Sequence, residues 1–152
     1  MMSAKKGFTL IEVLFTAGLL IAGIIGLMQV FIQSSRLSTM SANMTFVMSE
    51  AQTKLEEIRD HTFNLIATDY AQGGALGNTF PLSKVNGTGV IYLKALNADL
   101  LEVKIVVSWR TDDNRLIGED SDLDGVLDEG EDQNGNGELD SVTMLATLIS
   151  KR

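Results

Sequence analysis

The sequence predicts an α+β fold, in which one long N-terminal α-helix packs on a small antiparallel β-sheet that carries an acidic loop insert. Three observations lead to it. The run 8–32 is almost continuously apolar, residues 37–58 repeat apolar side chains at helical spacing, and residues 103–109 alternate between apolar and polar side chains. The remaining feature is a segment, residues 111–140, with twelve acidic residues, one basic residue and a net charge of −11.

The composition excludes several classes of site. The chain has 152 residues, which suits one domain of ordinary size, and no cysteine, which excludes disulfides, thiolate metal sites and cysteine nucleophiles. Its single histidine, His61, excludes a histidine-pair mechanism. No nucleotide-binding glycine motif appears, so an enzyme is not expected. With 12 basic and 20 acidic residues, the chain is a poor candidate for binding nucleic acid.

The apolar run at the N-terminus predicts a membrane-spanning helix, because about 20 apolar residues cross a bilayer. Lys5 and Lys6 precede it, and positive charge before an apolar span favours keeping that end in the cytoplasm. The run is not followed by the Ala-x-Ala pattern of an ordinary secretory signal. A small residue, Gly7, precedes the apolar run instead, which is the reverse of the order in a secretory signal.

The helix is predicted to continue without a break to about Asp60, because residues 34–59 contain neither proline nor glycine. One face of this second half is apolar and is expected to pack on the globular domain: Leu37, Met40, Met44, Val47, Ala51, Leu55 and Ile58. A short helical turn is expected at 63–70, and a loop at 72–78. Pro81 is assigned to an irregular connection that joins the helix to the sheet.

Three strands are predicted after that connection. Residues 90–96 and 100–109 read as a hairpin with one buried face, and residues 142–149 as a third strand. Three strands packed on an amphipathic helix make a small α+β domain.

The acidic segment contains the oxygen-ligand pattern of an EF-hand loop, D-x-D-x-D-G-x5-E, beginning at Asp120. In this pattern alternate carboxylates converge on one cation, a backbone carbonyl contributes at the seventh position, and a glutamate closes the shell. The ligands predicted by the pattern are Asp120, Asp122, Asp124, Val126 through its carbonyl, Asp128 and Glu131.

The pattern partly repeats twelve residues later, at Asp132, Asn134, Asn136, Glu138 and Asp140, but Thr143 stands where the closing glutamate should be. Oxygen-only ligands favour Ca²⁺ over zinc or copper, so we predict one calcium ion in the first loop and a second in the repeat. The flanking segments read as strands, which indicates an EF-like loop in a β setting. The alternative is a solvated acidic loop with Asn-Gly turns.

Residues 5–14 read Lys-Lys-Gly-Phe-Thr-Leu-Ile-Glu-Val-Leu. This motif resembles the N-terminal signal of the type IV pilin-like family, which includes pilins and type II secretion pseudopilins. The resemblance implies cleavage by prepilin peptidase after Gly7 and N-methylation of Phe8. It also implies that Glu12 pairs with the amine of Phe8 in a neighbouring subunit, so that the partners are other pilin or pseudopilin subunits.

The resemblance divides the chain into a leader peptide, residues 1–7, a transmembrane and filament-core helix, residues 8–33, and a periplasmic or extracellular pilin-like globular domain, residues 34–152. Residues 111–141 form the acidic calcium loop of that domain. The expected location is the inner membrane, crossed once with the C-terminal domain in the periplasm, followed by a pilus or pseudopilus and, for a pilus, the cell surface.

Residues 23–28 and 49–59 are most similar to PilV-type minor pilins, which implies a structural subunit in type IV pilus assembly. Two alternatives stay open: a minor pseudopilin of a type II secretion system, and a calcium-dependent adhesion module on a pilus. Family members often close the C-terminal region with a disulfide, and calcium would take that place here.

Overall fold

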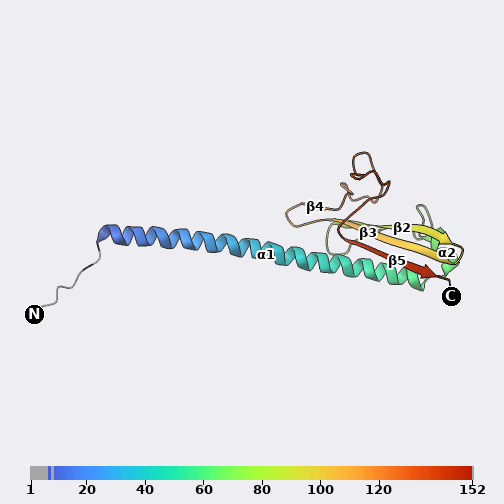
Figure 1. The fold of residues 1–152 in the computed structure, drawn as a ribbon, viewed down its shortest axis with the longest axis horizontal. Coiled ribbons are helices and arrows are strands. Elements are labelled where there is room, and N and C mark those ends of the chain that lie inside the picture. Colours follow the sequence, from blue (N-terminus) through green and yellow to red (C-terminus); the bar gives the residue numbers. More distant parts are fainter. Residues whose placement is uncertain (1–6, 8, 152) are drawn as a thin grey trace, which may run out of the picture. The chain divides into compact units, whose positions relative to one another are not determined.

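The computed structural model describes Gly7 and residues 9–151, and the chain divides into two compact units, Met1–Met40 and Ser41–Arg152. Phe8, the expected methylated residue, and the leader residues 1–6 lie outside the described part. Helix α1 (Leu10–Asp60) is one uninterrupted helix, as the absence of proline predicts. The chain is drawn in Figure 1.

In the first unit, α1 presents an apolar surface on all sides. Every large apolar side chain from Leu10 to Ile32 is between 49% and 83% exposed. A helix that is apolar all round is stable only when lipid or other protein covers it. Among the described residues, α1 is the one helix long and apolar enough to cross a membrane.

In the second unit, the last five turns of α1 pack on the rest of the domain. Val47, Ala51 and Ile58 of the predicted apolar face are buried, whereas Met44 is 37% exposed. Within this unit, the buried part of the apolar face therefore begins at Val47. Helix α2 (Phe63–Asp69) follows directly, in the predicted place, and buries Ile66.

The sheet is antiparallel and has five strands: β1 (Thr79–Pro81), β2 (Gly87–Asn97), β3 (Leu100–Arg110), β4 (Leu116–Ile117) and β5 (Met144–Ser150). The strands β2 and β3 form the predicted hairpin, and β5 is the predicted third strand. The short strands β1 and β4 were not expected. Pro81 closes β1, at the edge of the sheet, where a missing N–H does not interrupt the ladder.

The strands β4 and β5 both pair with the same edge of β3, one after the other. Leu116–Ile117 pair with Trp109–Arg110, and residues 144–150 pair with residues 100–106. Residues 118–143 therefore leave the edge of β3 and return to it, which makes the acidic segment an insert between two strands. This long excursion is seen above the sheet in Figure 1.

The prediction of one buried face for the hairpin is wrong for the second half of β3. Val106, Ser108 and the alternate residues Val107 and Trp109 are all buried. Within the second unit, α1 covers one face of the sheet, and the insert covers the other face over this half (Figure 1). This half of β3 is thus enclosed between a helix and a loop.

Candidate metal centre

The first loop of the insert is organised around the carboxylate of Asp120, which is fully buried. Its Oδ1 accepts a hydrogen bond from the backbone nitrogen of Leu123 at 2.7 Å, and its Oδ2 accepts one from Gly125 at 3.0 Å. Asp122 accepts from the nitrogen of Asp124 at 3.3 Å. These contacts bend the chain so that alternate side chains turn toward a common centre.

Three of the predicted ligands do converge. One carboxylate oxygen from each of Asp120, Asp122 and Asp124 lies within 4.8 Å of the other two. Ca²⁺–oxygen distances are about 2.3–2.6 Å, so oxygens around one ion lie within about 5 Å of one another, as these three do. The Asp triad could therefore hold a hard divalent cation.

Glu131, the closing residue of the loop, is buried and folds back over the loop start. Its Oε1 accepts hydrogen bonds from the nitrogen and the hydroxyl of Ser121 at 2.6 and 2.7 Å, and its Oε2 accepts one from the nitrogen of Asp128 at 3.1 Å. Burial by itself would raise the pKa of Glu131, but these hydrogen bonds outweigh it and the pKa lies below its ordinary value. Glu131 is thus held as a carboxylate beside the triad.

The second loop repeats several hydrogen bonds of the first, shifted by twelve residues, and adds one from Asn136 to Asp132. Asp132 accepts from the nitrogens of Gly135, Asn136 and Gly137 at 2.6, 3.0 and 2.8 Å. Asn134 accepts from the nitrogen of Asn136, as Asp122 does from Asp124. The two halves of the insert are therefore structural repeats.

Backbone angles confirm this repeat. The fourth position has φ +66° at Leu123 and +72° at Gly135, and the sixth has φ +80° at Gly125 and +79° at Gly137. Glycine adopts these angles freely, but leucine does so at a cost. Leu123 therefore has a positive φ that leucine disfavours, because the turn of the loop requires it.

The starting carboxylates of the two loops have different electrostatic surroundings. Burial raises the pKa of Asp120, aided by the charges of Glu131 and Asp122, although the N–H groups of Gly125 and Leu123 oppose it. Asp132 has the reverse shift, since the backbone N–H of Gly137 and its neighbours hold its pKa below the ordinary value. The starting carboxylates of the two loops thus have pKa shifts of opposite direction.

The structure places the remaining predicted ligands less uniformly. Asp140 Oδ2 accepts hydrogen bonds from the side-chain nitrogens of Asn134 and Asn136, both at 2.6 Å, so these three do come together. Glu138 is directed to the sheet, where it forms an ion pair with Lys104 of β3, and Lys104 Nζ also lies 3.8 Å from Asp140. Glu138 is therefore better placed to hold the insert on the sheet than to bind a metal ion.

Three residues of the predicted pattern remain: two predicted ligands of the first loop, and the residue at the closing position of the second loop. Val126 donates its N–H to Asp124 at 2.7 Å, with an exposed side chain, which is consistent with a role for its backbone alone. Asp128 is exposed and contributes its N–H to Glu131. Thr143, in the closing position of the second loop, is buried and accepts from Trp109 Nε1 at 3.5 Å. The second loop closes on the core, and its shell lacks a bidentate glutamate.

Several residues that hold the insert on the sheet were not singled out from the sequence. The hydroxyl of Tyr92 accepts the N–H of Leu139 at 2.8 Å, Thr88 donates to the carbonyl of Leu123, and Arg110 donates to the carbonyl of Ser121 at 2.6 Å. Their side chains reach the insert from β2 and β3, far away in the sequence. A polar residue within an otherwise apolar strand, such as Thr88, is the one signal that the sequence offers.

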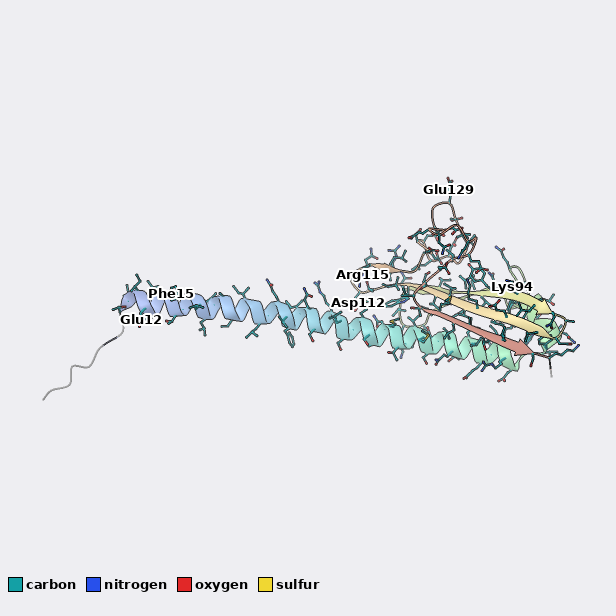
Figure 2. The ribbon with its side chains drawn as sticks, viewed as in Figure 1. Glu12, Phe15, Lys94, Asp112, Arg115 and Glu129 are labelled. Atoms are coloured by element: carbon teal, nitrogen blue, oxygen red, sulfur yellow. The ribbon has the colours of Figure 1, made fainter. Side chains whose placement is uncertain are left out.

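The ends of the insert are tied together. The N–H of Glu119 donates to the carbonyl of Asp140 at 2.9 Å, and the N–H of Asp140 donates to the carboxylate of Glu119 at 3.0 Å. Figure 2 shows Glu129 at the tip of the insert, pointing away from the sheet. Both loops are thus closed at their base and exposed at their tip.

The predicted processing motif lies at the start of α1. Gly7 is exposed, and Thr9 and Glu12 form a reciprocal pair at the helix end: the nitrogen of Thr9 lies 3.5 Å from Glu12 Oε2, and the nitrogen of Glu12 lies 3.4 Å from Thr9 Oγ1. This is the arrangement of a capping box. Glu12 and Phe15 are labelled in Figure 2. Glu12 therefore has a local structural role as well as the predicted intermolecular one.

Comparison of the chain with protein-family models, with curated proteins and with solved structures gives no match. The function is therefore argued from the residues and their arrangement.

Proposed function

We propose that this chain is a type IV pilin-like minor subunit, processed by prepilin peptidase, that takes part in type IV pilus assembly and whose globular domain is stabilised by calcium. The observation that carries the proposal is the order of parts: the motif around Gly7, Phe8 and Glu12 opens an apolar helix that continues, unbroken, into the core of an α+β domain. A subunit of this design keeps its anchor after cleavage and offers an apolar helix to its neighbours.

The charge at Glu12 supports an assembly role. It is a carboxylate in the first turn of a helix that is otherwise apolar for more than five turns. In lipid or in a packed filament such a group needs a partner, and an N-terminal amine created by cleavage would supply one. The capping contacts with Thr9 are long, at 3.4–3.5 Å, and leave the carboxylate exposed for that pairing.

Calcium binding is supported by the convergence of Asp120, Asp122 and Asp124 and by the repeated loop geometry. Without a cation, the net charge of −11 in residues 111–140 opposes folding of the insert. Since the insert covers half of one sheet face, a cation that compacts it also protects the core. Calcium then has the stabilising role that a disulfide has in other members of the family.

The direct test is N-terminal processing. The full chain is produced in cells that contain prepilin peptidase, and the N-terminus is determined by mass spectrometry. We expect a methylated Phe8 as the first residue, and no cleavage in a Gly7→Val variant. Gly18→Val is the matched control, because an added Cβ meets nothing within 4 Å at either glycine. An N-terminus that is unaffected by Gly7→Val contradicts the proposal.

Deletion of the gene distinguishes the proposed function from its two alternatives. Loss of surface filaments, with this chain present in wild-type filaments, supports the minor pilin. Loss of enzyme secretion with normal pili favours the alternative of a minor pseudopilin in a type II secretion system. Loss of attachment with normal pili and normal secretion favours a calcium-dependent adhesion module.

A further inference from the structure

Strand β5 forms an open border of the sheet, seen in red in Figure 1. In the part of the chain that the structure describes, β5 pairs with β3 and with no other strand. The ladder is extended at both ends, by the N–H of Val107 to the carbonyl of Thr143 and by the N–H of Lys151 to the carbonyl of Asp99. The border is therefore continuous over nine residues, 143–151.

The register identifies which backbone groups face outward. Because Thr143 and Lys151 both bond toward β3, every second residue between them does so as well. The residues in between direct their N–H and C=O groups to the open side: Met144, Ala146, Leu148 and Ser150. Their side chains are all exposed. The border thus offers four donors and four acceptors in the spacing of a β-strand.

This border lacks the features that keep sheet edges from pairing. Natural edge strands carry charges, prolines or bulges, or are very short. Residues 144–150 contain no charged residue, no proline and no glycine, and their register with β3 is regular. At the opposite border, β1 has three residues, ends in Pro81 and pairs only with residues 88–90 of β2, and the rest of β2 carries Lys94 and a register shift at 95–97. The opposite border therefore has a proline, a charge and an irregularity, and β5 has none of these.

A cavity lies beside the C-terminal part of this border. It has a volume of about 270 Å³ and is lined by Arg59, His61, Phe63 and residues 148–150. Arg59 donates one hydrogen bond, to Thr147 Oγ1 at 3.1 Å, and His61 pairs with Asp69 at 2.7 Å. Arg59 and Lys151 place two positive charges at this end of the border, beside Glu102 opposite Leu148, whereas the other end adjoins the acidic insert.

We propose that the outer edge of β5 binds an extended segment of a partner protein, which adds to the sheet as an antiparallel strand and places a carboxylate side chain in the cavity beside Arg59. An antiparallel strand has its amino end at Ser150 and its carboxyl end at Thr143. Charge complementarity then specifies the sequence of the segment. An acidic residue precedes the part that pairs with β5, uncharged residues form the paired part, and basic residues follow it. This surface is independent of the processing motif and of the metal ligands.

The proposal excludes a second copy of this chain as the occupant, for a reason of geometry. Two β5 strands paired antiparallel would be related by a twofold axis perpendicular to the strands. Within each copy, the half of α1 in the second unit lies along the sheet (Figure 1), so the two helices would run in opposite directions. Two copies anchored side by side in one membrane have their α1 helices in the same direction and cannot pair in this way; this step rests on the proposed function.

The test uses the full chain in detergent micelles and fluorescent peptides of about ten residues. The probe peptide has the sequence Glu-Thr-Val-Thr-Val-Thr-Val-Thr-Lys-Lys, and the control peptide has the two charged ends exchanged. Binding is measured by fluorescence anisotropy. We expect the probe to bind about tenfold more tightly than the control, and an Arg59→Gln variant to lose most of that preference.

Edge variants separate strand addition from simple charge attraction. Leu148→Lys puts a charge on the edge and should weaken binding of the probe by about tenfold. Leu96→Lys is the matched control, because Leu96 is similarly exposed, at 45% against 56%, but lies on β2, away from the β5 edge. Ala146→Pro is a second edge variant, since the lost N–H faces outward and the ladder to β3 is kept. Thermal melting of each variant establishes that it is folded.

Three results would overturn the proposal: no binding of either peptide, binding that neither edge variant weakens, and equal binding of probe and control. A dimer in light scattering that Leu148→Lys dissociates would also overturn it, because a second copy would then occupy the edge.

Discussion

The carboxylate of Glu131 accepts two hydrogen bonds from Ser121, at 2.6 Å from the backbone nitrogen and 2.7 Å from the hydroxyl. The residue predicted to close the first loop is thus folded over the second residue of that loop. In the second loop the corresponding residue is Thr143, which is buried in the core instead. The two loops therefore differ in what completes them.

The first prediction concerns calcium and thermal stability. Calcium at about 100 times its dissociation constant should raise the melting temperature of the full chain in detergent by roughly 5–10 °C over a chelator-treated sample. Glu131→Gln should remove most of this increase, because it removes a charge beside the Asp triad. Glu129→Gln is the matched control, since Glu129 is exposed at the tip of the insert. An unchanged melting temperature on chelation would refute the stabilising role.

Glu12 offers a separation of its two roles. Glu12→Gln keeps a side chain that completes the capping box with Thr9 but removes the charge, whereas Glu12→Val removes both. If the charge pairs with a neighbouring subunit, the two variants should be equally defective in assembly, as measured by the amount of this chain in sheared filaments. If capping is what matters, Glu12→Gln assembles normally and only Glu12→Val fails.

Gly125 and Gly130 provide a test of the packing of the insert against the sheet. Both have positive φ, at +80° and +94°, so alanine at either position costs about 1–2 kcal/mol in backbone strain. At Gly125 an added Cβ would also lie 2.5 Å from Thr79 Cγ2, whereas at Gly130 it meets nothing within 4 Å. Gly125→Ala should therefore destabilise clearly more than Gly130→Ala in denaturant unfolding. Equal losses would show that the first loop does not press on the sheet.

The raised pKa of Tyr70 predicts that the domain loses stability at high pH. Burial and the hydrogen bond to Glu57, 3.0 Å long, raise the pKa of Tyr70 to about 12. An ordinary tyrosine ionises near pH 10, so this contribution is fully present below about pH 10 and is lost as the pH rises to about 12. Tyr70→Phe should flatten the unfolding free energy over this range. Ultraviolet titration of the phenol gives the pKa directly, and an ordinary value would contradict the prediction.

The lowered pKa of Glu57 predicts a corresponding loss of stability in acid. The hydrogen bond from Lys54, at 2.7 Å, and that from Tyr70 outweigh burial and lower the pKa of Glu57. A lowered pKa contributes stability above the ordinary glutamate range, and this contribution is lost as the pH falls through the folded value. The Glu57→Gln variant should therefore show a weaker decline of stability in acid than the parent chain. A decline as steep as that of the parent would assign the acid sensitivity to other carboxylates.

Much of the fold could be predicted because the relevant signals are local. The apolar run from Leu10 and the helical spacing of Val47, Ala51 and Ile58 depend only on neighbours along the chain, and so does the alternation around Val103. Likewise, a ligand pattern such as Asp120, Asp122 and Asp124 brings its side chains together through turns of a few residues. Local sequence was sufficient for the helix, the main hairpin and the first loop.

What the sequence alone determined is therefore the continuous helix, the three main strands, the Gly7–Glu12 motif and the repeated acidic loops. Only the tertiary structure decided where the insert lies, why both faces of β3 are buried, that Glu138 pairs with Lys104, and that β5 has an open edge. The reason is physical: each of these depends on which segments distant in the sequence meet across the sheet. Which segments become neighbours depends on how much apolar area their contact buries and on whether their backbone groups find hydrogen-bond partners. The residue pattern of a single segment does not contain this information.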